Sequence, residues 1–277
     1  MANEKRSVEV VLDIGGSPAE VWKALTDPEE LTRWFPLQAQ VRPGLGGETS
    51  WQWDGHWTWV SAIERWEPGV ALTLVNRDQR PFDVEGRPLP EGATSPATLT
   101  MEFTLETLEG KTRLRLVHSG FGRGAAWDDE FEGVSVGWQY ELRSLKFYLE
   151  RHRGRRRRAG LATRACDLTQ SEAWRRLTTP DGFRFDHWPV REGERYQAWS
   201  ATGDRFAGEV NWQLPERDFF GTVAELGDGI FRLGTHRSGG RTGVTVWIAS
   251  YTADPGHVDG IRARSEDLLD RLFPAGT

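Results

Sequence analysis

Four tryptophans at alternate positions are the residues whose spacing most clearly predicts a binding site. Trp51 and Trp53 are two residues apart, and so are Trp57 and Trp59 beyond a turn predicted at residues 54–55. Residues two apart on a strand face the same side of a sheet, and the two pairs meet across a hairpin. On a concave face the indoles would form an aromatic wall for an apolar molecule. The alternative is that they pack the sheet or cover its outer side.

His118 is the best candidate for hydrogen bonding or proton transfer. It ends a strand-like segment in phase with Leu114 and Leu116, so its imidazole is expected to point inward. A buried imidazole needs a polar partner, and this one could donate to a ligand oxygen or act as an acid or base. Satisfaction by the backbone is the third alternative and the commonest.

Acidic, cysteine and glycine motifs add no second reactive group. Asp128-Asp129-Glu130 precedes a long predicted helix, where the helix dipole alone favours carboxylates. Cys166 is the only cysteine, which excludes an internal disulfide and a cysteine-based zinc site. The chain contains no HExxH motif and no Gly-x-Ser-x-Gly elbow at a strand-to-helix turn, and its Gly-rich segment 44–47 fits neither a P-loop nor a dinucleotide fingerprint. We therefore predict no catalytic residue, no metal and no cofactor, and enzymatic activity is left open.

The elements that must position these side chains follow from alternating apolar and polar residues. Strands are expected at residues 8–14, 48–53, 56–66, 71–76, 98–107 and 112–119. A helix over about 129–152 carries one apolar stripe, formed by Phe131, Val134, Trp138, Leu142, Leu145 and Leu149. Gly133 and Gly137 on this helix could make room for a ligand, loosen the helix or allow close packing with a strand. The order predicts an antiparallel meander with one buried face, closed by a long helix.

An internal repeat divides the chain. Residues 19–28 align without gaps with residues 171–180, an offset of 152, and five of the ten positions are identical. In both copies a strand-like segment comes first, then a capping residue, Ser17 or Thr169, and then a short amphipathic helix. The two halves are therefore expected to share one fold.

The second copy is expected to be a shortened version of the first. Its strands are predicted at 162–168, 195–201, 205–214, 219–226, 230–236 and 243–252, with a helix over 255–273. The tryptophan of the first helix and the middle of the last helix are 116 residues apart in the first copy and 92 in the second. The Pro- and Gly-rich segment 79–97 has no counterpart and is expected to be a loop at a cavity mouth. The second copy should have a smaller cavity, or none.

Several segments of the first copy resemble a known family. Residues 21–31, VWKALTDPEEL, followed by Trp34 and Phe35, resemble the opening of domains similar to the activator of the ninety-kilodalton heat-shock protein's ATPase. Residues 112–121 and 137–149 resemble the last strand and the C-terminal helix of the same family, a branch of the SRPBCC or START-like superfamily. The resemblance implies an α+β helix-grip fold, a curved antiparallel sheet wrapped around a long C-terminal helix with a deep cavity between them. Superfamily members hold lipids, polyketides or hormones there, and some are cyclases or hydrolases.

The predicted organisation is a START-like domain at residues 1–150, a basic linker at 151–159 and a shortened second domain at 160–277. Residues 1–150 hold 15 Lys and Arg against 24 Asp and Glu, whereas residues 151–158 hold six arginines. An acidic body repels phosphate backbones, so specific nucleic-acid binding is not expected. The linker is expected to be solvated and open to proteases, and the alternatives are that it rests on an acidic domain surface or touches nucleic acid.

These observations predict a cytoplasmic protein whose first domain binds an apolar, aromatic or polycyclic small molecule. The alternatives are a chaperone-regulating or other protein-interaction module, and a cyclase or hydrolase acting within the cavity. No run of about 18 apolar residues and no signal-peptide core is present, so no membrane partner is expected, and a homodimer remains open. The predicted ligand-binding residues are Trp34, Phe35, Trp51, Trp53, Trp57, Trp59, Met101, Phe103, His118, Phe131, Val134 and Trp138.

Overall fold

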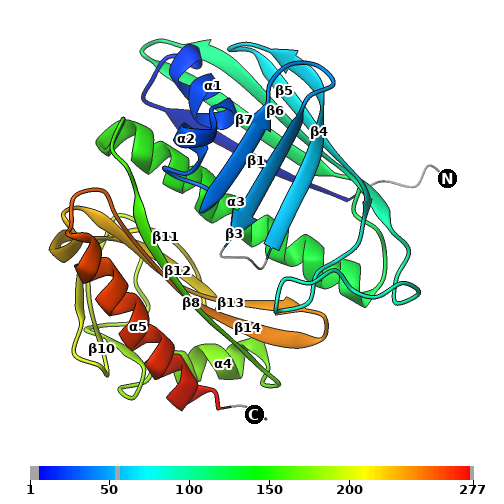
Figure 1. The fold of residues 1–277 in the computed structure, drawn as a ribbon. Coiled ribbons are helices and arrows are strands. Elements are labelled where there is room, and N and C mark those ends of the chain that lie inside the picture. The colour runs from blue at the N-terminus through cyan, green and yellow to red at the C-terminus, as the bar shows by residue number, and fades with distance from the viewer. Residues whose placement is uncertain (1–5, 54–56, 275–277) are drawn as a thin grey trace. The chain divides into compact units, whose positions relative to one another are not determined.

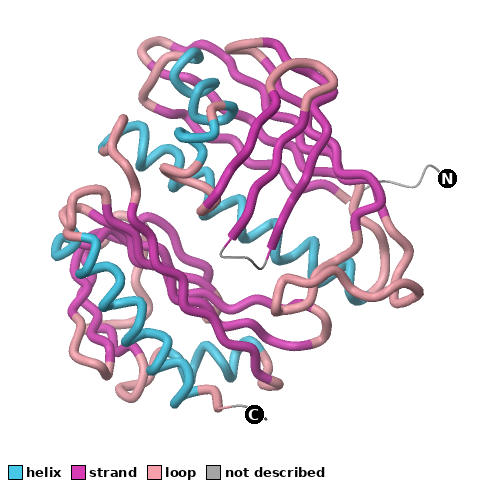
Figure 2. Tube along the Cα trace, in the orientation of Figure 1, coloured by secondary structure: helices cyan, strands magenta, loops and turns pink. Residues whose placement is uncertain are grey.

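The structure is a computed structural model that describes residues 6–53 and 57–274, and the chain divides into two compact units, residues 1–154 and 155–277. Each unit is a seven-stranded antiparallel sheet with helices (Figures 1 and 2). This confirms the predicted α+β, helix-grip class in two tandem copies. The turn predicted at Asp54 and Gly55 lies outside the described residues.

The first unit opens with one strand, two short helices and an edge strand: β1 (Ser7–Ile14), α1 (Pro18–Thr26), α2 (Pro28–Leu31) and β2 (Gln38–Arg42). The meander follows with β3 (Glu48–Trp53), β4 (Trp57–Glu67), β5 (Ala71–Gln79), β6 (Ala97–Leu108) and β7 (Lys111–Ser119). The strand order is β1-β7-β6-β5-β4-β3-β2. The long helix α3 (Ala125–Arg151) then runs along one face of this sheet (Figure 1).

Strand β7 shows why this face of the sheet is buried. Its residues alternate, with Leu114, Leu116 and His118 buried and the residues between them more exposed. The register with β6 places His118 opposite Met101 and Leu116 opposite Phe103. Buried rows of neighbouring strands therefore line up into one continuous inner face.

The repeat is visible in the caps of two helices. The Ser17 side chain accepts a hydrogen bond from the backbone N–H of Glu20, whose carboxylate accepts in return from the backbone N–H of Ser17. Thr169 and Glu172 make the same pair of contacts at the start of α4 (Gln170–Leu177). Both partners are offset by 152 residues, so the two copies share a capping box at the same place in the fold.

The second unit repeats the winding of the first. Its elements are β8 (Arg158–Cys166), α4, β9 (Phe183–Phe185), β10 (Arg195–Ser200), β11 (Arg205–Leu214), β12 (Asp218–Val223), the 3-10 turn η1 (Ala224–Leu226), β13 (Gly229–Ser238), β14 (Arg241–Ser250) and α5 (Pro255–Leu272). The strand order, β8-β14-β13-β12-β11-β10-β9, again places the first strand beside the last.

Aromatic side chains fill the interior of the second unit. Phe183, Phe206, Phe219 and Phe231 are all fully buried. The Phe206 and Phe231 rings stack with centroids 4.0 Å apart, and Phe183 lies 5.5 Å from Phe231. These rings form part of the hydrophobic core of the second unit.

Three local features differ from the sequence prediction. The short edge strands β2 and β9 were not predicted, because three to five residues are too few to establish a period, although β2 does alternate. The long helix begins at Ala125, earlier than residue 129. The connection between the units is shorter than 151–159, because α3 continues to Arg151 and β8 begins at Arg158.

The basic connection is held in part by acidic and aromatic partners. Arg153 forms an ion pair with Glu20, and Arg158 forms one with Asp259. The Arg155 and Arg156 side chains between them are exposed. No helix among residues 6–53 and 57–274 combines the length and the apolar composition needed to pass through a membrane.

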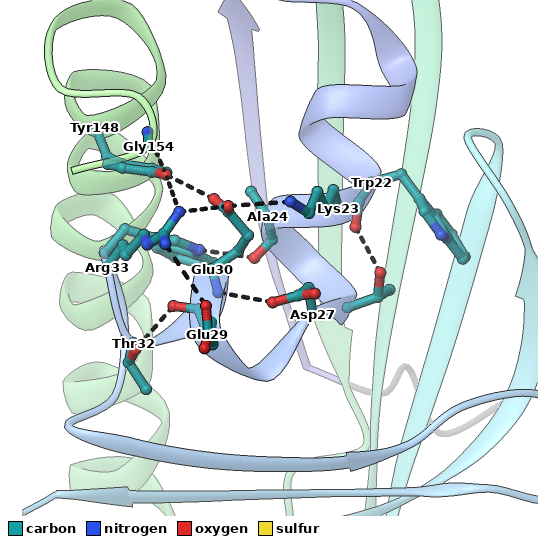
Figure 3. A network of polar contacts seen from close by, with 12 residues as sticks. Trp22, Lys23, Ala24, Asp27, Glu29, Glu30, Thr32, Arg33, Tyr148 and Gly154 are labelled. Carbon is teal, nitrogen blue, oxygen red and sulfur yellow. Dashed lines mark hydrogen bonds and ion pairs between the residues drawn. The ribbon is translucent and has the colours of Figure 1, made fainter. Parts of the chain in front are cut away.

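A buried polar network ties the end of α3 to α2 (Figure 3). The Tyr148 hydroxyl donates to Glu30 Oε2 over 2.6 Å and accepts from the backbone N–H of Gly154 over 2.9 Å. Arg33 donates to the other oxygen of Glu30 over 2.6 Å. Glu30 is only 8% exposed, so these partners offset the cost of removing its carboxylate from water. The network fixes the point at which the chain leaves α3.

Candidate ligand site

The four tryptophans lie on the inner face of the first sheet. Trp51 pairs with Trp59, and Trp53 with Trp57, across β3 and β4. The Phe35 ring, which follows α2, meets the Trp51 and Trp53 rings edge-on, each at 5.0 Å. Trp51 is buried and the other three are half-buried. The structure therefore places these indoles on the inside of the sheet and excludes a cover on its outer side, whereas a wall for a ligand stays a prediction.

Phe35 connects this aromatic wall to the long helix. Its ring stacks on Trp138 of α3 at 5.3 Å and on Trp34 at 4.9 Å. Trp34 is itself part of the core, because its indole N–H donates to the carbonyl of Ala24 over 2.9 Å and only 1% of the residue is exposed. Phe103 on β6 meets Trp138 edge-on at 5.9 Å. Phe35, Phe103 and Trp138 thus line the interior, and Trp34 supports Phe35.

His118 is held by α3 and not by the backbone. The indole Nε1 of Trp138 donates to His118 Nδ1 over 3.0 Å. Burial lowers the pKa of His118 to about 3, so the ring is neutral. Because Nδ1 accepts, the single ring proton lies on Nε2. That Nε2 has no hydrogen-bond partner among the described residues, so His118 presents an unpaired N–H donor.

Aromatic rings surround this imidazole. Trp59 lies 5.8 Å from it, edge-on, and Phe121 lies 4.8 Å from it. Phe121 in turn meets Phe131, a half-buried residue of α3, at 5.2 Å. His118 is therefore part of the same connected set of rings as the tryptophan wall.

The two remaining predicted residues, Met101 and Val134, differ in position. Met101 is fully buried and is the cross-strand neighbour of His118. Val134 is half-buried and lies one turn before Trp138 on α3. Both share a face with a member of the aromatic set.

A row of polar side chains, not predicted from the sequence, crosses the same inner face. Thr49, Ser61 and Asn76 lie on β3, β4 and β5 and are buried. Ser61 Oγ donates to Asn76 Oδ1 over 2.9 Å, whereas Thr49 Oγ1, opposite Ser61, has no partner among the described residues. The sequence could have predicted this row, because Thr49 is two residues from Trp51 and Ser61 is two residues from Trp59. Residues two apart on a strand face the same side of the sheet.

Residues 80–96 form a loop that touches the aromatic wall. The Phe82 ring stacks on Trp59 at 6.3 Å and is 5% exposed. Two side chains from the start of α3 hold the loop. Glu130 Oε2 accepts from the Phe82 backbone N–H over 3.3 Å, and the Trp127 indole donates to the Ser95 carbonyl over 3.0 Å. The loop thus closes against α3 and the wall together.

Glu130 is a titratable group whose environment the sequence prediction missed. Burial raises the pKa of its carboxyl to about 7, and the hydrogen bond from Phe82 acts in the opposite direction. The helix begins at Ala125, so Glu130 lies beyond its first turn and faces the loop. The helix dipole, which was the predicted explanation for this acidic run, therefore does not account for Glu130.

The two glycines of α3 face open space. A methyl group built on either Gly133 or Gly137 would meet no atom within 4 Å. Close packing with a strand, one of the predicted alternatives, is thereby excluded. A Cβ can therefore be added at either position without a clash.

The interior of the first unit provides aromatic rings for stacking and N–H groups for hydrogen bonding. Within the two described ranges, no three histidine, cysteine or carboxylate side chains come together as metal ligands would. The interior can enclose planar apolar groups and donate N–H bonds from two aromatic rings. An ionisable carboxyl stands at the loop.

Residues 16–150 match the family model described as "Activator of Hsp90 ATPase homolog 1-like protein". None of the curated proteins matches the chain.

Among solved structures, the chain is similar to protein MLL2253 from Mesorhizobium loti, with 22% identity over 53% of this chain and 99% of that one, at a TM-score of 0.45. It is also similar to BexL, a di-domain ARO/CYC protein from the BE-7585A biosynthetic pathway, with 13% identity over 96% and 92% and a TM-score of 0.44. DynU16, a protein in the dynemicin biosynthetic locus, gives 17% identity over 95% of both chains and a TM-score of 0.42. Likeness at this level does not identify a ligand.

Proposed function

Because residues 16–150 are a domain of the Activator of Hsp90 ATPase homolog 1-like family, within the SRPBCC superfamily, we propose that the first unit binds a hydrophobic, aromatic small molecule inside its sheet. The observation that carries this proposal is the connected set of rings from Trp53 to Phe131, which encloses polar atoms that have no partner among the described residues. A buried polar group normally has a partner, and an unpaired one costs about 1–3 kcal/mol.

Open space at Gly137 supports the same proposal and provides its test. Gly137→Phe tests it, because a Cβ at this position meets no atom within 4 Å and the next residue of α3 is Trp138. We expect the wild-type chain to bind N-phenyl-1-naphthylamine, a neutral probe that becomes fluorescent in apolar surroundings, and the variant to lose at least about tenfold in affinity.

The matched control is Gly260→Phe, on the last helix of the second unit, where the introduced Cβ lies near only the Arg264 side chain. This variant should bind the probe as the wild type does. Absence of probe binding to the wild-type chain, or equal loss in both variants, would contradict the proposal.

Glu130 favours a second candidate, proton transfer to or from a bound ligand. A carboxyl whose pKa is about 7 can both accept and donate a proton near neutral pH. We expect such a group to remove a proton from the carbon next to a ligand carbonyl and to return one. In deuterated water, proton NMR should show faster exchange of that hydrogen in 1-tetralone with the wild type than with Glu130→Gln. Equal exchange rates would rule out this role.

A further inference from the structure

The loop of residues 80–96 keeps its shape through its own hydrogen bonds. The backbone N–H of Asp83 donates to the carbonyl of Arg87 over 2.8 Å, and the N–H of Leu89 donates to the carbonyl of Pro81 over 2.8 Å. The Asp83 side chain also accepts from the backbone N–H of Arg87 over 2.9 Å. A segment whose backbone groups are paired within itself can leave a surface as one body, because few of those groups then need new partners.

Contacts near both ends join this loop to the rest of the first unit. Near one end, the Phe82 ring stacks on Trp59 of β4, and the Phe82 backbone N–H donates to Glu130 Oε2 of α3. Near the other end, the Ser95 carbonyl accepts from the Trp127 indole. Trp59 faces the inside of the sheet and is half-buried with the loop in place, so release of Phe82 would uncover it.

The Glu130 carboxyl is enclosed without a cation. The residue as a whole is half-buried, but desolvation is the main cause of its raised pKa, so the carboxyl is the enclosed end. Within residues 6–53 and 57–274 it takes part in no ion pair. A negative charge at this position would lose its hydration and keep the Phe82 N–H in exchange. The contact therefore suits the neutral carboxyl better than the charged one.

The charged groups around this contact do not change that balance. On the loop, Arg87 pairs with Asp83 and Glu85, and at the start of α3, Asp128 pairs with Arg6. The other titratable or charged side chains on these elements or in the aromatic set are Arg80, Glu91, Arg123, Asp129, Glu132 and His118. The pKa of the Glu130 carboxyl is set by burial and, in the opposite direction, by the hydrogen bond from the loop, and not by these charges.

We propose that residues 80–96 form a lid over Trp59, that the neutral Glu130 carboxyl latches this lid to α3, and that ionisation of the carboxyl releases it. The proposal goes beyond the proposed binding function, because the movement of the loop does not depend on any ligand. When the lid opens, the carboxylate regains water and the Phe82 ring leaves Trp59. Ligands would then reach the aromatic wall faster at higher pH, and this consequence alone rests on the proposed function.

The direction of the pH dependence follows from the two states of the carboxyl. Its pKa is raised from 4.5 to about 7 with the lid closed, whereas a hydrated carboxyl in the open state returns to its ordinary value. Closure is therefore favoured most below about pH 4.5, weakens as the pH rises to about 7 and stays constant above it. Linkage predicts that the open fraction rises roughly tenfold to a hundredfold between pH 5 and pH 8.

Hydrogen exchange at the Phe82 amide tests the latch in the full chain. Selective nitrogen-15 labelling of phenylalanine gives an NMR spectrum of only 13 residues, and Phe103, in the middle of β6, provides an internal reference. The two amides share the chemical dependence of exchange on pH, so the ratio of their rates reports the lid. In the wild type, the rate at Phe82 relative to Phe103 should rise at least about tenfold from pH 5 to pH 8.

Three variants assign this rise to the latch. Glu130→Gln keeps the size of the side chain but cannot ionise, so its ratio should stay constant, whereas the matched control Glu132→Gln should keep the rise. Trp127→Phe removes the donor to Ser95, so it should speed exchange at Phe82 at pH 5 and keep the rise as well. A wild-type ratio that stays constant or falls as the pH rises overturns the latch, whether or not any variant folds.

Binding of N-phenyl-1-naphthylamine separates this inference from the proposed function. In stopped-flow fluorescence its association rate should rise with pH in the wild type and not in Glu130→Gln, and a constant wild-type rate beside a rising exchange ratio would overturn the role of the loop as a lid. A wild type that binds no probe but keeps the rising ratio contradicts the binding function alone. A wild type that binds the probe with a constant ratio overturns the latch alone.

Discussion

Trp138 donates from its indole nitrogen to Nδ1 of His118 over 3.0 Å, and this contact decides which nitrogen of the imidazole carries the proton. One partner comes from α3 and the other from β7. The same contact that packs the helix against the sheet therefore also determines that the Nε2 atom of His118 is a hydrogen-bond donor.

Replacing the Trp138 donor should allow His118 to adopt both of its neutral tautomers. Trp138→Phe keeps an aromatic ring but leaves His118 Nδ1 without its N–H partner, so long-range proton–nitrogen NMR should show a mixture of both neutral forms in place of Nε2–H alone. Removing the buried bond and part of the ring should lower the free energy of unfolding by about 2 kcal/mol in denaturant titrations. A spectrum with Nε2–H alone in the variant would show that Trp138 does not control the proton.

Glu130 should make the first unit less stable as the pH rises. Its pKa is raised from 4.5 to about 7 in the folded chain, so the stability it contributes is present below about pH 4.5 and lost as the pH passes 7. Glu130→Gln stays neutral and should remove this loss. Between pH 5 and pH 8 the wild type should lose about 1–3 kcal/mol relative to the variant, measured by urea unfolding at each pH.

Buried histidines act in the opposite direction, which is why the comparison with the variant is needed. The pKa values of His118 and His236 are lowered to about 3 and about 4 by burial, so their stabilisation is lost as the pH falls below about 6.5. They are unchanged in Glu130→Gln and cancel in the difference. Glu132→Gln, two residues along α3, should not reproduce the effect. A constant difference across the pH range would contradict the role of Glu130.

Gly137→Ala should stabilise the chain and weaken binding. Alanine is favoured over glycine inside a helix by about 1 kcal/mol, and the added methyl meets no atom within 4 Å. The same methyl narrows the space beside Trp138, so affinity for N-phenyl-1-naphthylamine should fall. Gly260→Ala, on α5, should give the gain in thermal stability without the loss of affinity. Loss of affinity in both, or in neither, would contradict a ligand beside Gly137.

Trypsin should cut the chain first between the two units. Arg155 and Arg156 are exposed, whereas Arg153 and Arg158 are engaged in ion pairs. Mass spectrometry of a brief digest should show two fragments joined at this point, and each should retain a cooperative thermal transition. The double variant with Arg155→Gln and Arg156→Gln should slow this cleavage. Early cuts within either sheet would contradict two independent domains.

Tyr148→Phe should loosen the junction at the end of α3. The change removes the donor to Glu30 and the acceptor of the Gly154 N–H, and leaves Arg33 as a partner of the buried carboxylate. We expect the free energy of unfolding to fall by about 1–3 kcal/mol. Hydrogen exchange at the Gly154 amide should become faster, and an unchanged exchange rate would show that the hydroxyl does not hold it.

The position of the tryptophans on one face and the internal repeat could both be predicted, because each depends only on residues that are close together in the sequence. Alternation from residue 48 to residue 53 places Trp51 and Trp53 on one face whatever surrounds them. The capping residues Ser17 and Thr169 lie directly before their helices, where a cap must be. Local rules were sufficient in both cases.

The partner of His118 and the state of Glu130 could not be predicted by those rules. Trp138 is 20 residues from His118 along the chain, and Phe82 is 48 residues from Glu130. Each pairing depends on where α3 crosses the sheet and where a long loop returns, and neither is encoded in a window of neighbouring residues. The backbone partner that is commonest for a buried histidine is replaced here by an indole.

Trp51 and His118 each keep a donor that has no partner within residues 6–53 and 57–274, and this also bears on how long the protein lasts in a cell. An empty first unit carries their cost, and a molecule that satisfies them shifts the folding equilibrium toward the native state by mass action. Proteases remove chains while they are unfolded, so a modest gain in stability changes abundance several-fold. The amount of this protein would then follow the supply of its ligand without any change in synthesis.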